Sequence, residues 1–572
     1  MRLKRILKIS AFASLVFAGC DDMFEPNIEN NRDFESMLDQ PNNIQGLIMN
    51  AYSRFNDGGT FFSNRIHEDL ATSDFYTNDL NSNWLLMGRG SWTTTNNPVD
   101  KWSEVRQAVQ YINLFLENVD KVTWAQNATD NAKFRKRLTG EAYALRGIHN
   151  YFFLRAHCGE VDGKLTGIPI LTSPESVTSD FNVPRQDFKT CVDQIFKDFD
   201  EALKLLPEEY KGEDRVNGKG MNGLICGRIV KAMRAETALM LASPLYASES
   251  GISWAQAAEY TAELLQGREI VADGNTWYEH TDEIKGLSDG AVPPEVLWRG
   301  DRSGEDDTGF EGDCYPPSLY GKGLINPTQN LVDAFPMANG YPISDPNSGY
   351  KANDPYANRD PRLDLYIIHD GSVFRGVEIK CGSTSTTDDQ LNNKNATKTG
   401  YYLKKLLNEE VDPNPSAKNG RQHYKARVRY TELFLNYAEA QNEAEGPQSK
   451  GKLGKSPYEI VKAIRQRGGI TNDQYLESIK SDPAKMRALI HNERRIELMG
   501  ENFRFWDLRR WKEPINETVK GMDVVDNGGS KTYEIFDIDK LQYDDHMYYG
   551  PIPETEILKW SNLKQNDGWK AE

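Results

Sequence analysis

The feature that most constrains this fold is a set of long segments in which apolar residues recur every three or four positions. In residues 101–119, Val105, Val109 and Ile112 fall at such steps and would lie on one face of a helix. The same spacing predicts helices over 131–158, 187–206, 225–246, 253–266, 427–445, 456–467 and 483–500. Each apolar face has to pack against another element, so the sequence predicts a predominantly all-α fold with few short strands.

The predicted helices follow one another in pairs of comparable length. Each pair can cover the apolar face of its neighbour, as the helix pairs of a tetratricopeptide solenoid do. The spacing is too irregular for a strict repeat of about 34 residues. We therefore expect tetratricopeptide-like helix pairs in a right-handed superhelical scaffold.

Long irregular stretches, 56–100, 273–362 and 368–426, separate some of these pairs and are rich in aromatic, Gly, Pro, Asn and Asp residues. Loops of such length are uncommon in compact domains and usually carry function. We expect the ligand to bind in these loops, in the 60s to 90s and around residues 310–325.

The N-terminus has the pattern of a lipoprotein signal peptide over residues 1–19. A basic start is followed by an apolar segment of 11 residues, 9–19, which is too short to span a membrane as a helix. The sequence Phe17-Ala18-Gly19-Cys20 resembles a lipobox, although Phe stands where Leu is usual. We expect cleavage before Cys20, acylation of Cys20, and a polar lipidated tether over 20–41. The alternative is an ordinary signal peptide in which the Cys occurs by chance.

Charge and hydropathy exclude two broad classes. The net charge of −17 argues against a nucleic-acid partner, because such binding depends on Lys and Arg that neutralise phosphates. The mean hydropathy is −0.66, and no run of about 18 apolar residues follows the start, so the chain is no multi-span membrane protein.

The cysteines beyond Cys20 form no CxxC pair. They are Cys158, Cys191, Cys226, Cys314 and Cys381, so at most two disulfides can form and one thiol is left over. Several of them lie in apolar helical segments, which favours buried free thiols.

Two glycine motifs lack the context that their chemistry needs. Residues 218–223 match GxGxxG, but a charged segment rather than a strand precedes them. Residues 286–290 match GxSxG, but two prolines follow at once where the nucleophile elbow needs a helix. We interpret the first as a loop that leads into a helix and the second as a turn.

The sequence offers no convincing metal site. His149 and His157 lie two turns apart on one predicted helix and have no HExxH partner. The acidic run 301–313 could bind calcium, but it lacks an EF-hand pattern, so a solvated loop is favoured. We expect no cofactor and no metal ion.

The carboxylates of the C-terminal third alternate with arginines at helical spacing, which favours structural ion pairs. They are Glu439, Glu443, Glu493, Glu497, Glu501 and Asp507, interspersed with Arg429, Arg494, Arg495, Arg504, Arg509 and Arg510. A glycosidase needs only two carboxylates about 5–10 Å apart, which the sequence alone does not exclude.

Several ordered motifs resemble the SusD/RagB family of outer-membrane lipoproteins. In the C-terminal third, 429–440 is similar to the family's RxxELxLxxAEA helix, and 492–498 with 500–511 is similar to its ERRxEL…G…RxxDLxRW signature. The remaining matches are 140–146, 327–335, 358–363, 549–553 with Glu556, and 563–569, where Asp567 replaces a common Pro.

This resemblance implies a cell-surface lipoprotein, lipid-anchored in the outer membrane through Cys20, that sits on a SusC-like TonB-dependent transporter. It implies a SusD-like N-terminal helical region over 42–250 and a C-terminal region over 251–572, packed as one unit. It further implies capture of oligosaccharides without catalysis. A peptide-binding relative remains an alternative, and so does a surface glycoside hydrolase.

Sugar rings stack their CH faces on aromatic side chains, while polar side chains bind the hydroxyls. The predicted stacking residues are Tyr76, Trp84, Trp92, Tyr315 and Tyr320, with Asp74 and Asn83 as polar partners. For any single one of these aromatics core packing is favoured, since most large aromatics are substantially buried.

Overall fold

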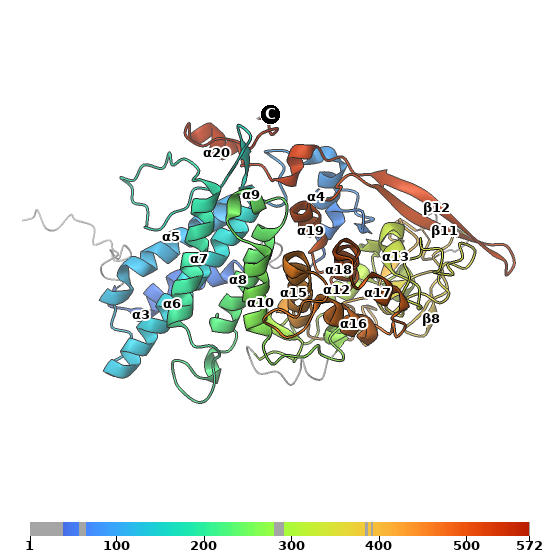
Figure 1. The fold of residues 1–572 in the computed structure, drawn as a ribbon, viewed down its shortest axis with the longest axis horizontal. Helices are drawn as coiled ribbons and strands as arrows, with labels where there is room; N and C mark the ends of the chain where they lie inside the picture. The colour runs from blue at the N-terminus through green and yellow to red at the C-terminus, as the bar shows by residue number, and fades with distance from the viewer. Residues whose placement is uncertain (1–37, 56–64, 280–290, 384–386, 390–392, 571–572) are drawn as a thin grey trace, which may run out of the picture.

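The computed structural model describes residues 38–55, 65–279, 291–383, 387–389 and 393–570 (Figure 1). The predicted signal peptide, Cys20 and the GxSxG motif at 286–290 lie outside the described residues.

The predicted helices are all present, with ends within a few residues of those expected. They are α5 (Trp102–Asn118), α6 (Ala128–His157), α7 (Phe188–Leu205), α8 (Gly227–Ala242), α10 (Trp254–Leu265), α15 (Tyr430–Glu445), α16 (Pro457–Arg467) and α18 (Pro483–Glu497). Local chemistry sets several of these ends. Ser253 and Ser456 form capping boxes with Gln256 and Glu459, each satisfying backbone N–H groups of a first turn.

The helices pack in a continuous series from one end of the molecule to the other. Helix α3 (Pro41–Ser53) packs on α5, and contacts then run through α6, α7, α8 and α10. Helix α10 next contacts α15, more than 160 residues further along the chain, and α15 contacts α16 and α18. Figure 1 shows this series crossing the molecule from the blue to the brown helices. The stretch between α10 and α15, which we call the loop excursion, therefore leaves a single helical stack and returns to it. The predicted helical fold class is confirmed.

The remaining elements are short, apart from one hairpin. The other α-helices are α4 (Asn83–Leu86), α9 (Ala247–Ser250), α12 (Gly309–Cys314), α13 (Gln329–Ala334), α14 (Arg362–Tyr366), α17 (Gln474–Ile479), α19 (Arg504–Trp511) and α20 (Glu554–Lys559). The short 3₁₀ helices are η1 (Glu68–Ala71), η3 (Val119–Lys121), η4 (Lys219–Met221), η5 (Trp277–Glu279), η6 (Pro317–Leu319) and η7 (Asp545–Tyr548). Element η2 (Met87–Ser91) is a short π-helix.

The strands form antiparallel pairs. The pairs are β1 (Phe75–Tyr76) with β5 (Asn326–Pro327), β2 (Gly159–Val161) with β3 (Lys164–Thr166), β4 (Val296–Arg299) with β10 (Ala426–Arg429), β6 (Ile367–Ile368) with β9 (Tyr402–Leu403), β7 (Val373–Phe374) with β8 (Val377–Glu378), and β11 (Thr518–Asp526) with β12 (Lys531–Lys540). The β11–β12 hairpin projects beside the loop excursion (Figure 1). The β4–β10 and β1–β5 pairs tie distant loops together, which positions the site described below.

The five described cysteines are free thiols, and all except the half-buried Cys226 are buried, so the interpretation as buried free thiols is confirmed. The GxGxxG segment forms the η4 turn in a loop, as interpreted. Within the described ranges, no helix combines the length and apolarity needed to cross a membrane. The same residues contain no group of three or more His, Cys, Asp or Glu side chains arranged to hold a metal ion.

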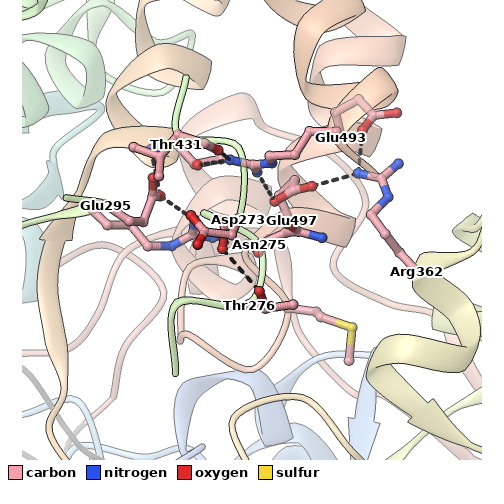
Figure 2. Close-up of polar contacts among 12 residues, drawn as sticks. Asp273, Asn275, Thr276, Glu295, Arg362, Thr431, Glu493 and Glu497 are labelled. Atoms are coloured by element: carbon pink, nitrogen blue, oxygen red, sulfur yellow. Dashed lines mark hydrogen bonds and ion pairs between the residues drawn. The ribbon is translucent and has the colours of Figure 1, made fainter. Parts of the chain in front are cut away.

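Buried ion pairs connect the C-terminal helices, as the alternating charges predict. Arg362 is fully buried, and its guanidinium donates to Asp360 at 2.7 Å, Glu493 at 2.9 Å and Glu497 at 2.8 Å. Glu497 also accepts from Arg467 at 2.6 Å. Burial alone would raise the pKa of Glu497, but Arg467 and Arg362 lower it. Figure 2 shows Glu493 and Glu497 turned toward Arg362.

A second set of buried ion pairs joins α15, α18 and α19. Glu439 accepts from Arg510 and from the indole N–H of Trp511 at 2.7 Å, while Asp507 bridges Arg510 and Arg494. These residues come from the segments 429–440, 492–498 and 500–511, which resemble the family motifs. We therefore infer that these segments fix how α15, α18 and α19 pack together.

Candidate functional site

A cavity of about 320 Å³, which we call the first cavity, lies between the loop excursion and the helical stack. Its volume falls in the range of about 300–1,000 Å³ that is typical of ligand sites. Its aromatic lining comes from distant parts of the chain: Phe55, Trp277, Tyr278, Phe310 and Tyr424. The ring centroids of Trp277 and Tyr424 are 5.5 Å apart. Tyr424 and Phe310 are half-buried, whereas the other three rings are buried behind them. The Trp277 indole N–H is buried and has no hydrogen-bond partner among the described residues.

The β4–β10 pair brings these segments together. Beyond the strands, the backbone N–H of Gly300 donates to Lys425 at 2.8 Å, and that of Ser303 donates to His423 at 2.9 Å. The pairing therefore continues into the loops that carry the cavity residues 300–303 and 423–425. The short turn η5 places Trp277 and Tyr278 against the same loops.

The polar lining is mostly basic. Arg65, Arg302, His423, Lys425 and Arg427 line the cavity, together with the carboxylates of Asp301 and Asp307. Burial lowers the pKa of Arg427 to about 10, so it stays cationic at neutral pH. Burial also lowers the pKa of Lys425, while Glu501 opposes that shift.

His423 connects the cavity wall to α12. Its Nε2 lies 2.9 Å from Glu311 Oε1, and its Nδ1 lies 3.6 Å from Asp307 Oδ2. Burial alone would lower the pKa of His423, but the two carboxylates raise it to about 9. Glu311 is fully buried, so the expectation of a solvated acidic loop is wrong at this position, although Asp301, Glu305 and Asp306 are exposed.

The His423 cluster predicts a pH-dependent stability. The folded-state pKa of about 9 exceeds the ordinary value near 6.5, so the stabilisation is complete below pH 6.5 and is lost as pH rises through 9. We expect a loss on the order of 3 kcal/mol across that window. Urea unfolding at pH 6 and pH 9.5 measures it, and His423→Gln should abolish this part of the pH dependence. If the free energy of unfolding depended on pH equally in the wild-type protein and in His423→Gln, the assignment of this effect to His423 would be wrong.

Several residues predicted from the sequence lie in the core instead of at a surface. Trp92 and Tyr315 are 2% and 0% exposed, and Tyr76 is 3% exposed. Trp92 packs on Trp569, and the Tyr315 hydroxyl donates to the Asn408 carbonyl at 2.6 Å. The expectation that these rings are exposed is wrong, because other loops cover them.

Asp74 is buried as well. Its carboxylate pairs with Arg495 and lies 3.5 Å from Arg504, and these arginines lower its pKa although burial opposes them. Asp74 therefore has a structural ion-pair role, and its expected exposure to a ligand is wrong.

The other predicted residues remain accessible. Tyr320 is 58% exposed and has a left-handed backbone with φ of 65°, which is costly for a residue other than glycine. Asn83 is exposed, and the half-buried Trp84 stacks on His67 with ring centroids 5.8 Å apart. Their ligand-binding role stays a prediction.

Sequence reasoning missed the aromatic residues that line the first cavity. Trp277 and Tyr278 are adjacent in an irregular stretch, which is a signal that could have drawn attention to them. Tyr424 lies in another stretch, about 150 residues away, and only the β4–β10 pairing brings it to Trp277. By contrast, Arg65 and Phe310 lie in the loop regions where ligand binding is expected.

Two family models match different parts of the chain. A sequence model described as the SusD family matches residues 294–569, and one described as starch-binding associating with outer membrane matches 25–219. A curated relative, SusD-like protein P25 from Formosa agariphila, is 29% identical over 110 residues. That match spans only 19% of each of the two chains.

Solved structures share the whole fold. A SusD-like protein from Bacteroides fragilis has a TM-score of 0.72 at 22% identity, covering 94% of this chain and 99% of its own. A SusD-like carbohydrate binding protein from the same species has a TM-score of 0.71 at 19% identity, covering 92% and 100%. The surface glycan-binding protein A of Bacteroides fluxus has a TM-score of 0.59 at 18% identity, covering 93% and 100%. The chain belongs to the SusD family.

Proposed function

We propose that this protein is a cell-surface lipoprotein that captures oligosaccharides in the first cavity and delivers them to a SusC-like TonB-dependent transporter. The observation that carries the proposal is the cavity itself, where aromatic rings adjoin charged side chains. Aromatic faces suit sugar CH faces, and charged groups bind hydroxyls through strong hydrogen bonds. The names of the structural relatives, a carbohydrate binding protein and a surface glycan-binding protein, support the same function.

The chemistry of the cavity favours binding over hydrolysis. A glycosidase needs a general acid whose pKa is raised. In the first cavity, hydrogen bonding to His423 lowers the pKa of Asp307, which makes this carboxyl a poor proton donor.

Several carboxyls outside the first cavity do have raised pKa values, and two of them, Glu432 and Glu236, line a cavity of their own. Burial raises the pKa of Glu432 to about 8 and also that of Glu236. They line a cavity of only about 40 Å³, which has room for water but not for a sugar ring. We therefore propose no enzymatic role for them.

The experiment that tests this function is a binding screen of the protein against a panel of polysaccharides and peptides, with released reducing ends measured in the polysaccharide samples. Retention of a polysaccharide without product is the expected result. Release of product would contradict a binding-only role. Retention of peptides with none of the glycans would favour the peptide-binding alternative.

We also propose that Cys20 carries the lipid anchor, which the lipobox-like sequence supports. Attachment of the lipid to the Cys20 sulfur through a thioether bond removes that thiol, whereas the five described thiols are free. Denatured protein isolated from its own host should therefore contain five thiols by Ellman titration, and a Cys20→Ser variant should also contain five. Six thiols in the wild-type protein would contradict the anchor.

Delivery to a transporter has its own test. A tagged form of the protein, solubilised from its own outer membrane in mild detergent, should co-purify with a TonB-dependent transporter. Recovery of the protein alone under conditions that preserve membrane complexes would contradict this part of the proposal.

A further inference from the structure

A second cavity of about 710 Å³ adjoins the first. Gly300, Asp301 and Arg427 line both, so the two cavities meet at the edge of the β4–β10 pair. The second cavity extends over the loop around η4 and the start of α8, where Lys219 and Arg228 lie. The loop that carries the GxGxxG sequence thus forms part of a cavity wall.

Basic side chains predominate in both cavities. To the basic residues of the first cavity, the second adds Lys211, Lys219, Arg228 and Arg299. The carboxylates among the described lining residues are Asp301, Asp307 and Glu209. The chain as a whole has a net charge of −17, so this concentration of basic groups runs against its composition. A hollow lined by charge of one sign focuses the field and attracts ligands of the opposite sign.

Two of these basic residues are buried arginines. Arg299 and Arg427 are each 8% exposed, and both lie on the β4–β10 pair where the cavities meet. Arg299 donates to the carbonyls of Ala291 at 2.7 Å and Gly300 at 2.9 Å.

Carboxylates of the chain take up part of the charge in the first cavity. Asp313 pairs with Arg65 at 2.6 Å, and Glu311 and Asp307 flank His423.

Carboxylates also take up part of the charge in the second cavity. Glu209 pairs with Lys211 at 2.5 Å and also with Arg228, while Lys219 pairs with Glu213 at 2.5 Å. Lys211 and Lys219 have side chains that are 78% and 65% exposed, so these pairs are open to exchange with an incoming anion.

We propose that the ligand is an elongated acidic oligosaccharide, bearing carboxylate or sulfate groups, that occupies both cavities. This inference rests on the proposed glycan-binding function and names its substrate class. The aromatic wall of the first cavity takes the sugar faces, and the basic groups at the junction and in the second cavity bind the anionic substituents.

The test uses acidic polysaccharides paired with neutral counterparts. Polygalacturonate and alginate are compared with their carboxyl-reduced forms, and carrageenan with its desulfated form. We expect at least one acidic glycan to bind about tenfold or more tightly than its neutral counterpart at low ionic strength. That preference should shrink as salt is added. The carboxylate and sulfate pairs together show which anion is recognised.

Charge-removing variants test whether both cavities take part. Arg302→Gln changes only the first cavity, and the double change Lys211→Gln with Lys219→Gln changes only the second. Each should weaken binding of the acidic glycan at least about threefold at low salt. The matched control is Lys480→Gln on α17, an exposed lysine that pairs with Glu477 and lines neither cavity. It should leave the affinity unchanged.

The outcomes separate the two proposals. Equal or tighter binding of the neutral counterparts would overturn the acidic ligand but leave glycan capture standing. An effect of only one of the two cavity variants would overturn an occupant that spans both. Binding of none of the glycans, acidic or neutral, would overturn the proposed function itself, and with it this inference.

Discussion

Replacement of Arg362 by methionine is expected to lower the free energy of unfolding by about 3–5 kcal/mol. The substitution leaves Asp360, Glu493 and Glu497 buried without the guanidinium that all three contact. Desolvated carboxylates that have lost a cation must either remain charged at a cost or take up protons. Urea denaturation at pH 7 measures the loss.

The matched control for this prediction is Lys480→Met. Lys480 also forms an ion pair, with Glu477 at 2.8 Å, but the two side chains are 47% and 45% exposed. Solvated pairs of this kind contribute little, so the midpoint of unfolding should not change. A loss below about 1 kcal/mol for Arg362→Met would contradict the structural role that we assign to the buried network.

Replacement of Tyr424 by alanine is expected to weaken binding of the captured glycan by about 10- to 100-fold. Tyr424 is half-buried in the wall of the first cavity and packs beside Trp277. Truncating a well-packed aromatic at the centre of a binding site commonly costs about 2 kcal/mol or more. Calorimetric titration with the glycan found in the screen gives the affinity directly.

Tyr111→Ala is the control for that variant, since Tyr111 is 37% exposed on α5 and lines neither cavity. Both variants should unfold at nearly the wild-type urea concentration, so a difference in affinity would report binding instead of folding. An unchanged affinity for Tyr424→Ala would exclude the first cavity as the stacking site.

The helices could be predicted because their signal is local. A stripe such as Val105, Val109 and Ile112 makes one face of α5 whatever the rest of the chain does. The buried charges of the signature segments were also predictable as ion pairs, because Glu439 and Arg510 lie among apolar helix positions. The β11–β12 hairpin was missed, although Gly528 and Gly529 form a turn of the kind that joins two strands.

The candidate site could not be read from the sequence because long-range contacts form it. Trp92 and Tyr315 are in irregular stretches, as the half-buried Tyr424 is, yet the first two rings are covered by segments distant in the chain. No local pattern distinguishes an aromatic that later packing covers from one that lines a cavity. The predicted loop regions therefore included part of the site. Most of the stacking residues predicted within them, however, are buried instead of exposed.

The most direct test of glycan capture is a crystal structure of the protein with an oligosaccharide of the polysaccharide that the screen identifies. We expect sugar rings in the first cavity, against its half-buried rings Tyr424 and Phe310, with intact glycosidic bonds. Sugar bound elsewhere, for example on Tyr320 with the first cavity empty, would contradict the assignment of the site, and a cleaved ligand would contradict the binding role.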